Sequence, residues 1–199
     1  MLTVNGDRDV VERQLAGGEL ACPSCGGVLG GWGNARLRRV RAAEGPDAVL
    51  VPRRSRCRGC GATHVLLPAW CLARRADAAG VIGAALEAAA AGGGHRRIAR
   101  VAGRAASTVR GWLRRFAGRA EAVRVFFTVL LARTGPDPVM PAGAAGLVAA
   151  AVAAIAGAAA AVASRWPQLG TVPVWAAASA ASGGRLLAPG WPAGGGNTN

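Results

Sequence analysis

The sequence contains CPSCG at residues 22–26 and CRGCG at residues 57–61, with 31 residues between the two CxxC motifs. Each CxxC motif can wrap one tight turn around a metal ion, so that its two thiolates lie on the same side. The glycine after each second cysteine permits the positive φ that such a turn needs. Two turns of this kind complete a closed tetrahedron. We therefore predict one structural Zn²⁺, held by Cys22, Cys25, Cys57 and Cys60.

Two other interpretations of the cysteines stay open: a pair of redox-active CxxC motifs, or free thiols packed in a core. Neither accounts for the glycine that follows both motifs. His64 lies four residues after Cys60 in a strand-like run, so we leave it outside the ligand shell. Cys71, between Trp70 and Leu72, is predicted to be a small buried residue.

Short β-type runs surround the cysteine motifs and are separated by glycines and prolines. These runs cover residues 35–41, 49–52 and 63–67. We predict that residues 20–70 form a zinc ribbon with a small antiparallel sheet. In the preceding segment, 1–19, residues 9–16 favour a short leading helix that is capped by Asp9 and ended by Gly17.

From residue 76 to residue 119 the apolar residues follow a helical period. The segment HRRIARVAGRAASTVRGWLRRF, residues 95–116, favours a helix-turn-helix with its turn at Gly103. The residues expected to pack together are Ile98, Ala99 and Ala102 of the first helix, Val109, Trp112, Leu113 and Phe116 of the second, and Val81, Ile82, Ala85, Leu86 and Ala89 of the preceding helix. Ala105 occupies the capping position of the second helix, and Ser107 is the alternative cap.

The opposite face of the second helix carries the candidate DNA contacts. These are Arg104, Ser107, Arg110, Arg114 and Arg115. Arginines projecting from such a helix would meet base edges or phosphates in a major groove. The net charge of the chain is +14, and residues 36–119 hold 18 arginines against four acidic residues. A basic field of this size is typical of a surface that neutralises phosphates. A solvated basic surface is the alternative.

Residues 120–185 are predicted to be a helical C-terminal region. It comprises an apolar helix over 121–133, a linker over 134–141 and an alanine-rich stretch over 142–166. An apolar stripe on that stretch contains Val148, Val152, Ile155, Ala159, Val162 and Trp166. We expect the stripe to pack on the 121–133 helix or on a second copy of the chain. The Gly/Pro-rich residues 186–199 are predicted to be a disordered tail.

The uncharged stretch at 142–163 is long enough to span a membrane. Its large aliphatic residues are few, and the glycines Gly143, Gly146 and Gly157 oppose insertion. A membrane-tethered regulator is therefore the weaker alternative.

Together the two motifs resemble a family of actinobacterial zinc-ribbon/helix-turn-helix proteins, and are similar to the DNA-binding N-terminal region of insertion-sequence transposases. The resemblance covers residues 20–119 and rests on CPxCG, CxxCG and the pattern Ile98-Ala99-x3-Gly103-x4-Thr108-Val109-x2-Trp112-Leu113. It implies DNA binding, with transposon ends as one candidate target, Arg110 and Arg114 in the recognition position, and the four cysteines on zinc.

A full transposase also has a catalytic domain in which acidic residues hold two metal ions. After the predicted helix-turn-helix this sequence has only Glu121 and Asp137 as acidic residues. Two carboxylates cannot supply the usual three-residue cluster, so we expect no enzymatic activity.

We therefore predict a mainly α protein with a small β zinc ribbon (α+β), which binds double-stranded DNA without catalysis. Residues 1–20 have several charges and no apolar core of an export signal, so we expect a cytoplasmic, nucleoid-associated protein. A homodimer would let two recognition helices reach successive half-sites. The alternative function is a zinc-ribbon adaptor in a protein or nucleoprotein complex.

Overall fold

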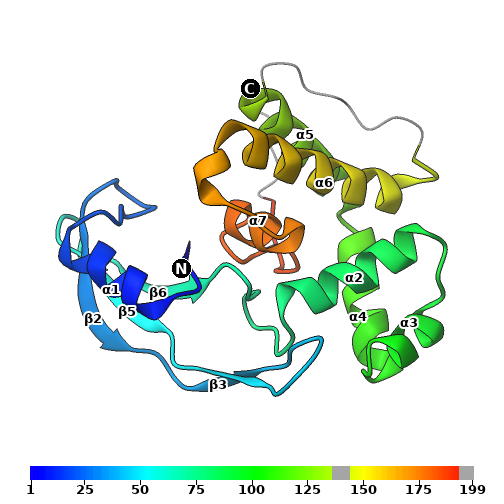
Figure 1. Cartoon of the computed structure of the whole chain (residues 1–199), viewed down its shortest axis with the longest axis horizontal. Coiled ribbons are helices and arrows are strands. Elements are labelled where there is room, and N and C mark those ends of the chain that lie inside the picture. Colours follow the sequence, from blue (N-terminus) through cyan, green and yellow to red (C-terminus); the bar gives the residue numbers. More distant parts are fainter. Residues whose placement is uncertain (136–143, 193–199) are drawn as a thin grey trace.

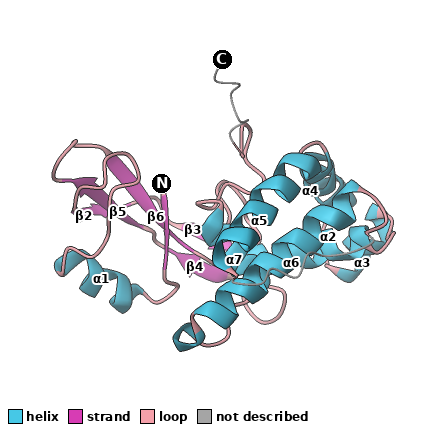
Figure 2. Cartoon of the chain, turned by 90° about the horizontal axis from the view of Figure 1, so that it is seen from above, coloured by secondary structure: helices cyan, strands magenta, loops and turns pink. Residues whose placement is uncertain are grey.

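The structure is a computed structural model that describes residues 1–135 and 144–192. Within these residues the chain forms β1 (Leu2–Val4), α1 (Arg8–Ala16), β2 (Leu29–Asn34), β3 (Arg38–Val40), β4 (Ala48–Leu50), β5 (Arg53–Cys57), β6 (Thr63–Pro68), α2 (Ala79–Ala90), α3 (His95–Val101), α4 (Ala106–Ala117), α5 (Ala120–Thr134), α6 (Leu147–Arg165), a 3₁₀ turn (Pro167–Leu169) and α7 (Val174–Ala181). The strands and α1 lie on one side of the molecule, and α2, α3 and α4 lie on the other (Figure 1). Figure 2 shows the same separation from above. The mixed α and β fold class is confirmed.

The main sheet has the strand order β1-β6-β5-β2, and β3 pairs with β4 in a separate hairpin. The pairs β2–β5 and β5–β6 are antiparallel, as predicted, but β1 adds to β6 in parallel. The predicted runs coincide with β3, β4 and β6 and miss β1, β2 and β5. The sequences of β2 (LGGWGN) and β5 (RRSRC) lack the alternation of apolar residues that marks a strand.

A small core lies under the main sheet. It contains Val4, Val11, Leu15, Cys22, Leu29, Cys57 and Leu66. Helix α1 contributes Val11 and Leu15 to this core and ends at Gly17, as expected. Its N-cap differs from the prediction, because the side chain of Asp7 accepts the hydrogen bond from the backbone N–H of Asp9 (2.8 Å).

The larger core joins α2, α3 and α4, and the apolar positions predicted for these helices are buried or packed against it, except Ala102, which is only partly buried and lies outside this core. Gly103, between α3 and α4, has a φ of +62°, which a glycine adopts without strain. Ala105 is the N-cap of α4 and no side chain caps this helix, so Ser107 is not a cap.

Helix α6 packs along α5 (Figure 1). This is one of the two predicted arrangements, the other being packing on a second copy of the chain. The predicted stripe is only partly right. The residues of α6 that are buried are Ala151, Ala154, Ile155, Ala158 and Ala159. Val148 and Val152 lie at the margin, and Trp166 is 39% exposed. Small alanine side chains let two helix backbones approach closely, so the contact forms on the alanine side. By length and composition α6 could also cross a membrane. In the structure its alanine side packs against α5, and the rest of the helix is exposed or partly buried.

The prediction of a disordered tail is wrong for residues 186–192. Leu186, Leu187 and Trp191 are buried in the helical core. The ring of Trp191 packs edge-on against Phe126, with 5.0 Å between ring centroids. The guanidinium of Arg119 donates to the carbonyl oxygens of Ala188 and Trp191. Composition suggested disorder because glycine and proline outnumber the three apolar anchors. Residues 193–199 and most of the predicted linker 134–141 lie outside the described residues.

Helix α7 lies in the predicted helical region 120–185, although no bounds were predicted for it, and it fastens the C-terminal segment to both halves of the chain. Trp175 lies where a side chain on Gly83 would stand, 2.1 Å from the Cβ position of that glycine, so α7 can approach α2 only because residue 83 is glycine. The indole N–H of Trp175 donates to Glu87 of α2 (2.7 Å). The hydroxyl of Ser179 donates to the carbonyl oxygen of Cys71 (2.6 Å).

A buried carboxylate joins the strand side to the turn between α3 and α4. The side chain of Asp77 is 3% exposed and accepts from Arg104 Nε at 2.5 Å and from Arg41 at 2.7 Å. Arg104 also donates to the carbonyl oxygen of Ala42 (2.8 Å). The structure therefore places Arg104, a predicted DNA contact, in an internal ion pair with only 14% of its side chain exposed.

We expect Asp77→Ala to lower the free energy of unfolding by about 3 kcal/mol or more, because two guanidinium groups lose their buried partner. Urea denaturation followed by circular dichroism measures this change. The matched control is Glu121→Ala, which removes an exposed ion pair with Arg124 and should leave the unfolding midpoint nearly unchanged. Equal midpoints for the two variants would contradict the structural role of Asp77.

Trp191→Ala should also destabilise the protein, by about 3 to 5 kcal/mol, because a large aromatic side chain is removed from a packed core. The same measurement applies, with Trp166→Ala as the control on an exposed tryptophan. A Trp191→Ala variant as stable as the parent chain would show that the tail does not contribute to the core.

Candidate metal centre and basic surface

The two CxxC motifs meet in space at one end of the β2–β5 pair. The four Sγ atoms of Cys22, Cys25, Cys57 and Cys60 all lie within 4.8 Å of one another. The sulfurs of Cys22 and Cys60 are 3.8 Å apart, and those of Cys25 and Cys57 are 3.5 Å apart. No pair forms a disulfide. The predicted ligand set is thus brought together and could hold a metal ion.

Both motifs use the same local geometry. In the first, the N–H of Gly26 donates to the carbonyl oxygen of Cys22 (2.8 Å); in the second, the N–H of Gly61 donates to that of Cys57 (3.1 Å). The φ angles of these glycines are +72° and +73°. The positive φ predicted after each second cysteine is therefore confirmed, and it explains why glycine follows both motifs.

Backbone N–H groups point at the sulfurs and favour their charged form. A hydrogen bond from the N–H of Ser24 lowers the pKa of the Cys22 thiol to about 7. The N–H of Cys60 lowers the pKa of the Cys57 thiol to about 6. For Cys60 itself the N–H of Ala62 acts to lower the pKa, but the neighbouring sulfurs of Cys25 and Cys57 outweigh it and raise the pKa to about 11. Four thiolates cannot crowd together without a cation to neutralise them.

The surroundings of the sulfurs fit a closed metal site. A Cβ on Gly27 would stand 3.1 Å from the sulfur of Cys57 and 3.3 Å from that of Cys25, so glycine leaves the sulfurs room. An ion bound by four protein sulfurs keeps no open position for water or a substrate. Such a site stabilises a fold and does not catalyse a reaction.

His64 lies next to the cluster without being one of its four members. Its Nε2 is 3.4 Å from the sulfur of Cys22, and its ring is buried. On β6 it pairs with Ser55 of β5, and both residues point to the inner face of the sheet. An imidazole here can hydrogen-bond a ligand sulfur from outside the four-cysteine set, where His64 was predicted to lie. Strand alternation counted from the exposed Thr63 would have indicated the inward direction.

Cys71, by contrast, is remote from this site and completely buried beside Val40 and Leu67. Burial raises the pKa of its thiol to about 12. It is the small core residue that was predicted.

The second candidate site is the outer face of α4. Val109, Trp112 and Phe116 are buried on the inner side of this helix. Ser107, Arg110, Arg114 and Arg115 are exposed on the other side. Arg115 donates to the carbonyl oxygen of Gly111 (3.0 Å), which holds its side chain along the helix. Four of the five predicted DNA contacts are thus exposed on α4, and Arg104 is not among them.

Helix α3 adds three further arginines to this end of the molecule. Arg96, Arg97 and Arg100 are exposed, and Val101 beside them is 85% exposed. The predicted DNA contacts include no residue of α3. The arginines that flank Ile98 and Ala99 carried the same signal in the sequence.

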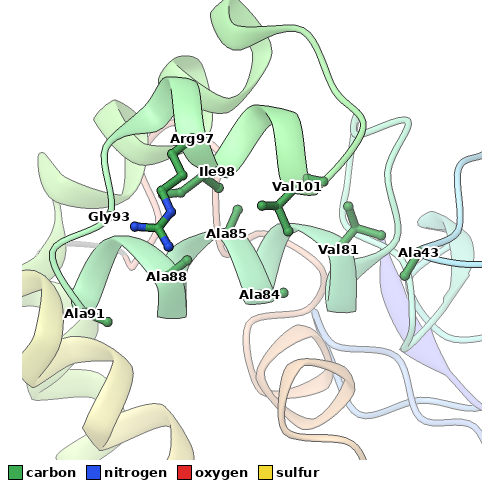
Figure 3. Close-up of a pocket in the computed structure, with 11 residues that line it drawn as sticks. Ala43, Val81, Ala84, Ala85, Ala88, Ala91, Gly93, Arg97, Ile98 and Val101 are labelled. Atoms are coloured by element: carbon green, nitrogen blue, oxygen red, sulfur yellow. The ribbon is translucent and has the colours of Figure 1, made fainter.

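A hollow of about 520 Å³ lies between α2 and α3 (Figure 3). Ala84 and Ala88 of α2 face Ile98 and Val101 of α3, and the side chain of Arg97 reaches over one end. The lining residues include no acidic, histidine, serine or cysteine side chain among the described residues. This hollow therefore offers no nucleophile, general acid or general base.

A family model described as a domain of unknown function (DUF6431) matches residues 22–112 of the chain. The matched region begins at Cys22 and contains all four clustered cysteines, α2, α3 and the first half of α4. Helices α5, α6 and α7 lie outside it. No curated protein and no solved structure matches the chain.

We expect the purified protein to bind one divalent metal ion per chain at the four cysteines, and Cys57→Ser to lose it. Metal analysis gives the stoichiometry, and Co²⁺ substitution gives the absorption of a tetrathiolate site. The matched control is Cys71→Ser, which alters a cysteine outside the cluster and should retain the metal. In Cys57→Ser the helical circular dichroism should persist because α2–α7 have a separate core. Full metal occupancy of Cys57→Ser would contradict this ligand set.

Proposed function

We propose that this protein binds double-stranded DNA through the outer face of α4 and that a structural Zn²⁺ holds its ribbon together. The observation that carries the proposal is the partition of α4. One side is fixed in the core by Val109, Trp112 and Phe116, and the other presents Arg110 and Arg114 to solvent. A rigid helix with free guanidinium groups on its outer side suits the major groove.

The free state of these arginines supports the proposal. Within the described residues, Arg110 and Arg114 make no side-chain hydrogen bond or ion pair. The arginines with structural roles, such as Arg104 and Arg119, are engaged in internal contacts instead. Guanidinium groups that are exposed and unpaired remain available for phosphates and for the O6 and N7 atoms of guanine.

The arrangement of α3, the turn at Gly103 and α4 also supports it, because a short first helix, a tight turn and a longer second helix are the parts of a helix-turn-helix. Arg96, Arg97 and Arg100 of α3 extend the basic surface beside α4. Phosphate contacts from α3 would position α4, whose own side chains would contact phosphates and the edges of bases.

Zinc is the ion that best suits the cysteine cluster. Four thiolates in two CxxC motifs are the ligand set of structural Zn²⁺ sites, and the compact arrangement of the sulfurs suits a tetrahedral ion. The resemblance to the DNA-binding region of insertion-sequence transposases supports a DNA partner, such as a transposon end or an operator. We propose no catalytic role for the described residues, and we propose that the protein acts in the cytoplasm at the nucleoid.

Affinity for a labelled DNA duplex should fall steeply with salt. Six arginines on α3 and α4 that contact phosphates would give a slope of log affinity against log salt near −5. Fluorescence anisotropy from about 50 to 200 mM salt measures it. The double variant Arg110→Ala/Arg114→Ala should weaken binding and make the slope less negative by about 2, because two phosphate contacts are lost.

The matched control is Arg13→Ala/Arg133→Ala, which removes two exposed arginines from α1 and α5 and preserves the same net charge as the test variant. It should bind like the parent chain. If both double variants bind equally, α4 does not contact DNA. If Arg110→Ala/Arg114→Ala keeps the duplex affinity of the parent chain but no longer binds a protein partner, the adaptor function is favoured.

A further inference from the structure

The outer face of the main sheet carries a row of arginines. On β5, Ser55 and Cys57 are buried, whereas Arg56 is exposed and Arg54 is partly exposed. Because side chains alternate along a strand, Arg54 and Arg56 share the outer face, about 6.6 Å apart along it. Successive phosphates of an extended nucleic-acid strand have a similar separation. The exposed Arg58 reaches the same face from the turn after β5, because its Nε lies 3.4 Å from the Cβ position of Gly30, the partner of Arg56 on β2.

An exposed tryptophan lies beside this row. Trp32 of β2 is 51% exposed, and the guanidinium carbon of Arg56 is 4.8 Å from the centre of its ring. Its neighbours Gly31 and Gly33 have no side chains that could cover the ring. Trp32 is not a member of the core under the sheet. The ring thus lies outside the core, with half of its surface open to solvent.

The face is hollowed and basic. A shallow hollow of about 730 Å³ is lined by Trp32, Arg56, Arg58 and the second cysteine motif. The side chain of Arg58 lies over Gly30, with its Nε 3.4 Å from the position a Cβ would take. No acidic residue lines this hollow among the described residues. We call Trp32, Arg54, Arg56 and Arg58 the ribbon face.

We infer that the ribbon face binds single-stranded nucleic acid, with an unpaired base stacked on Trp32 and phosphates held by the arginine row. Aromatic side chains in a basic groove are the usual means of binding a single strand without sequence preference. The flat ring of Trp32 can stack only on the exposed face of a base. In a duplex that face is buried between neighbouring base pairs. The ribbon face therefore suits unpaired nucleotides better than duplex DNA.

This inference goes beyond the duplex binding proposed for α4 and uses none of its residues. The ribbon face lies on the strand side, whereas α4 lies at the opposite end of the molecule (Figure 1). The two sites can therefore be tested separately. A chain with both would hold a duplex end and an adjacent unpaired strand.

The test uses the metal-loaded full chain and a labelled oligothymidylate of about 15 nucleotides. We expect Trp32→Ala to lower affinity about 10-fold, because stacking on the ring is lost, and Trp32→Phe to lower it less. The matched control is Trp166→Ala. Trp166 is also exposed and also carries an arginine over its ring, Arg165 at 5.3 Å, but it lies at the end of α6. This variant should bind like the parent chain.

Arg56→Gln/Arg58→Gln should weaken binding and reduce its salt dependence, since two phosphate contacts are lost. These variants keep the inference testable if Trp32→Ala lowers the metal content. Oligouridylate in a parallel titration distinguishes RNA from DNA as the source of the strand. In contrast, Arg110→Ala/Arg114→Ala should lower duplex affinity and leave oligothymidylate affinity unchanged.

Three results would overturn the inference: equal affinities for the Trp32 and Trp166 variants, single-strand binding that is lost in the α4 variant instead, or displacement of the oligonucleotide by poly-glutamate of equal charge. The last result would identify an acidic protein segment as the partner of the ribbon face. None of these outcomes depends on whether α4 binds a duplex.

Discussion

The approach of four sulfurs to within 4.8 Å of one another constrains the fold of the first half of the chain. They can ionise together only around a cation, and their positions fix the ends of two otherwise weak strands. The glycine-rich β2 and the arginine-rich β5 have few apolar residues to hold them. Their pairing is dictated by the cysteine motifs at Cys25 and Cys57. The outer face of β5 is thereby free to carry charge, because little of the strand is needed for packing.

A second constraint links the half that contains the cysteine cluster to the helices. Asp77 lies between Arg41, which follows β3, and Arg104, which follows the turn after α3. One carboxylate with two guanidinium partners holds the α3–α4 turn against the strand side. This contact gives Arg104 a structural role. Its charge is used inside the protein, whereas Arg110 and Arg114 on α4 are exposed.

Local patterns predicted much of the molecule. The CxxC spacing was sufficient to identify the four clustered cysteines, and the helical period separated the buried Trp112 from the exposed Arg110. Features that depend on distant parts of the chain were missed. Strand β1 needs β6 as its template, the alanine contact of α6 depends on the shape of α5, and Asp77 has no local signal. Composition misled for residues 186–192, because three apolar side chains outweigh their glycines and prolines.

The burial of Trp191 against Phe126 has a consequence for synthesis on the ribosome. All four cysteines have been translated by residue 60, so the cysteine cluster can assemble early in synthesis. The aromatic surface around Phe126 stays uncovered until residue 191 emerges from the exit tunnel. Throughout that interval the nascent chain exposes an apolar patch, and chaperones that recognise such patches would find their substrate there.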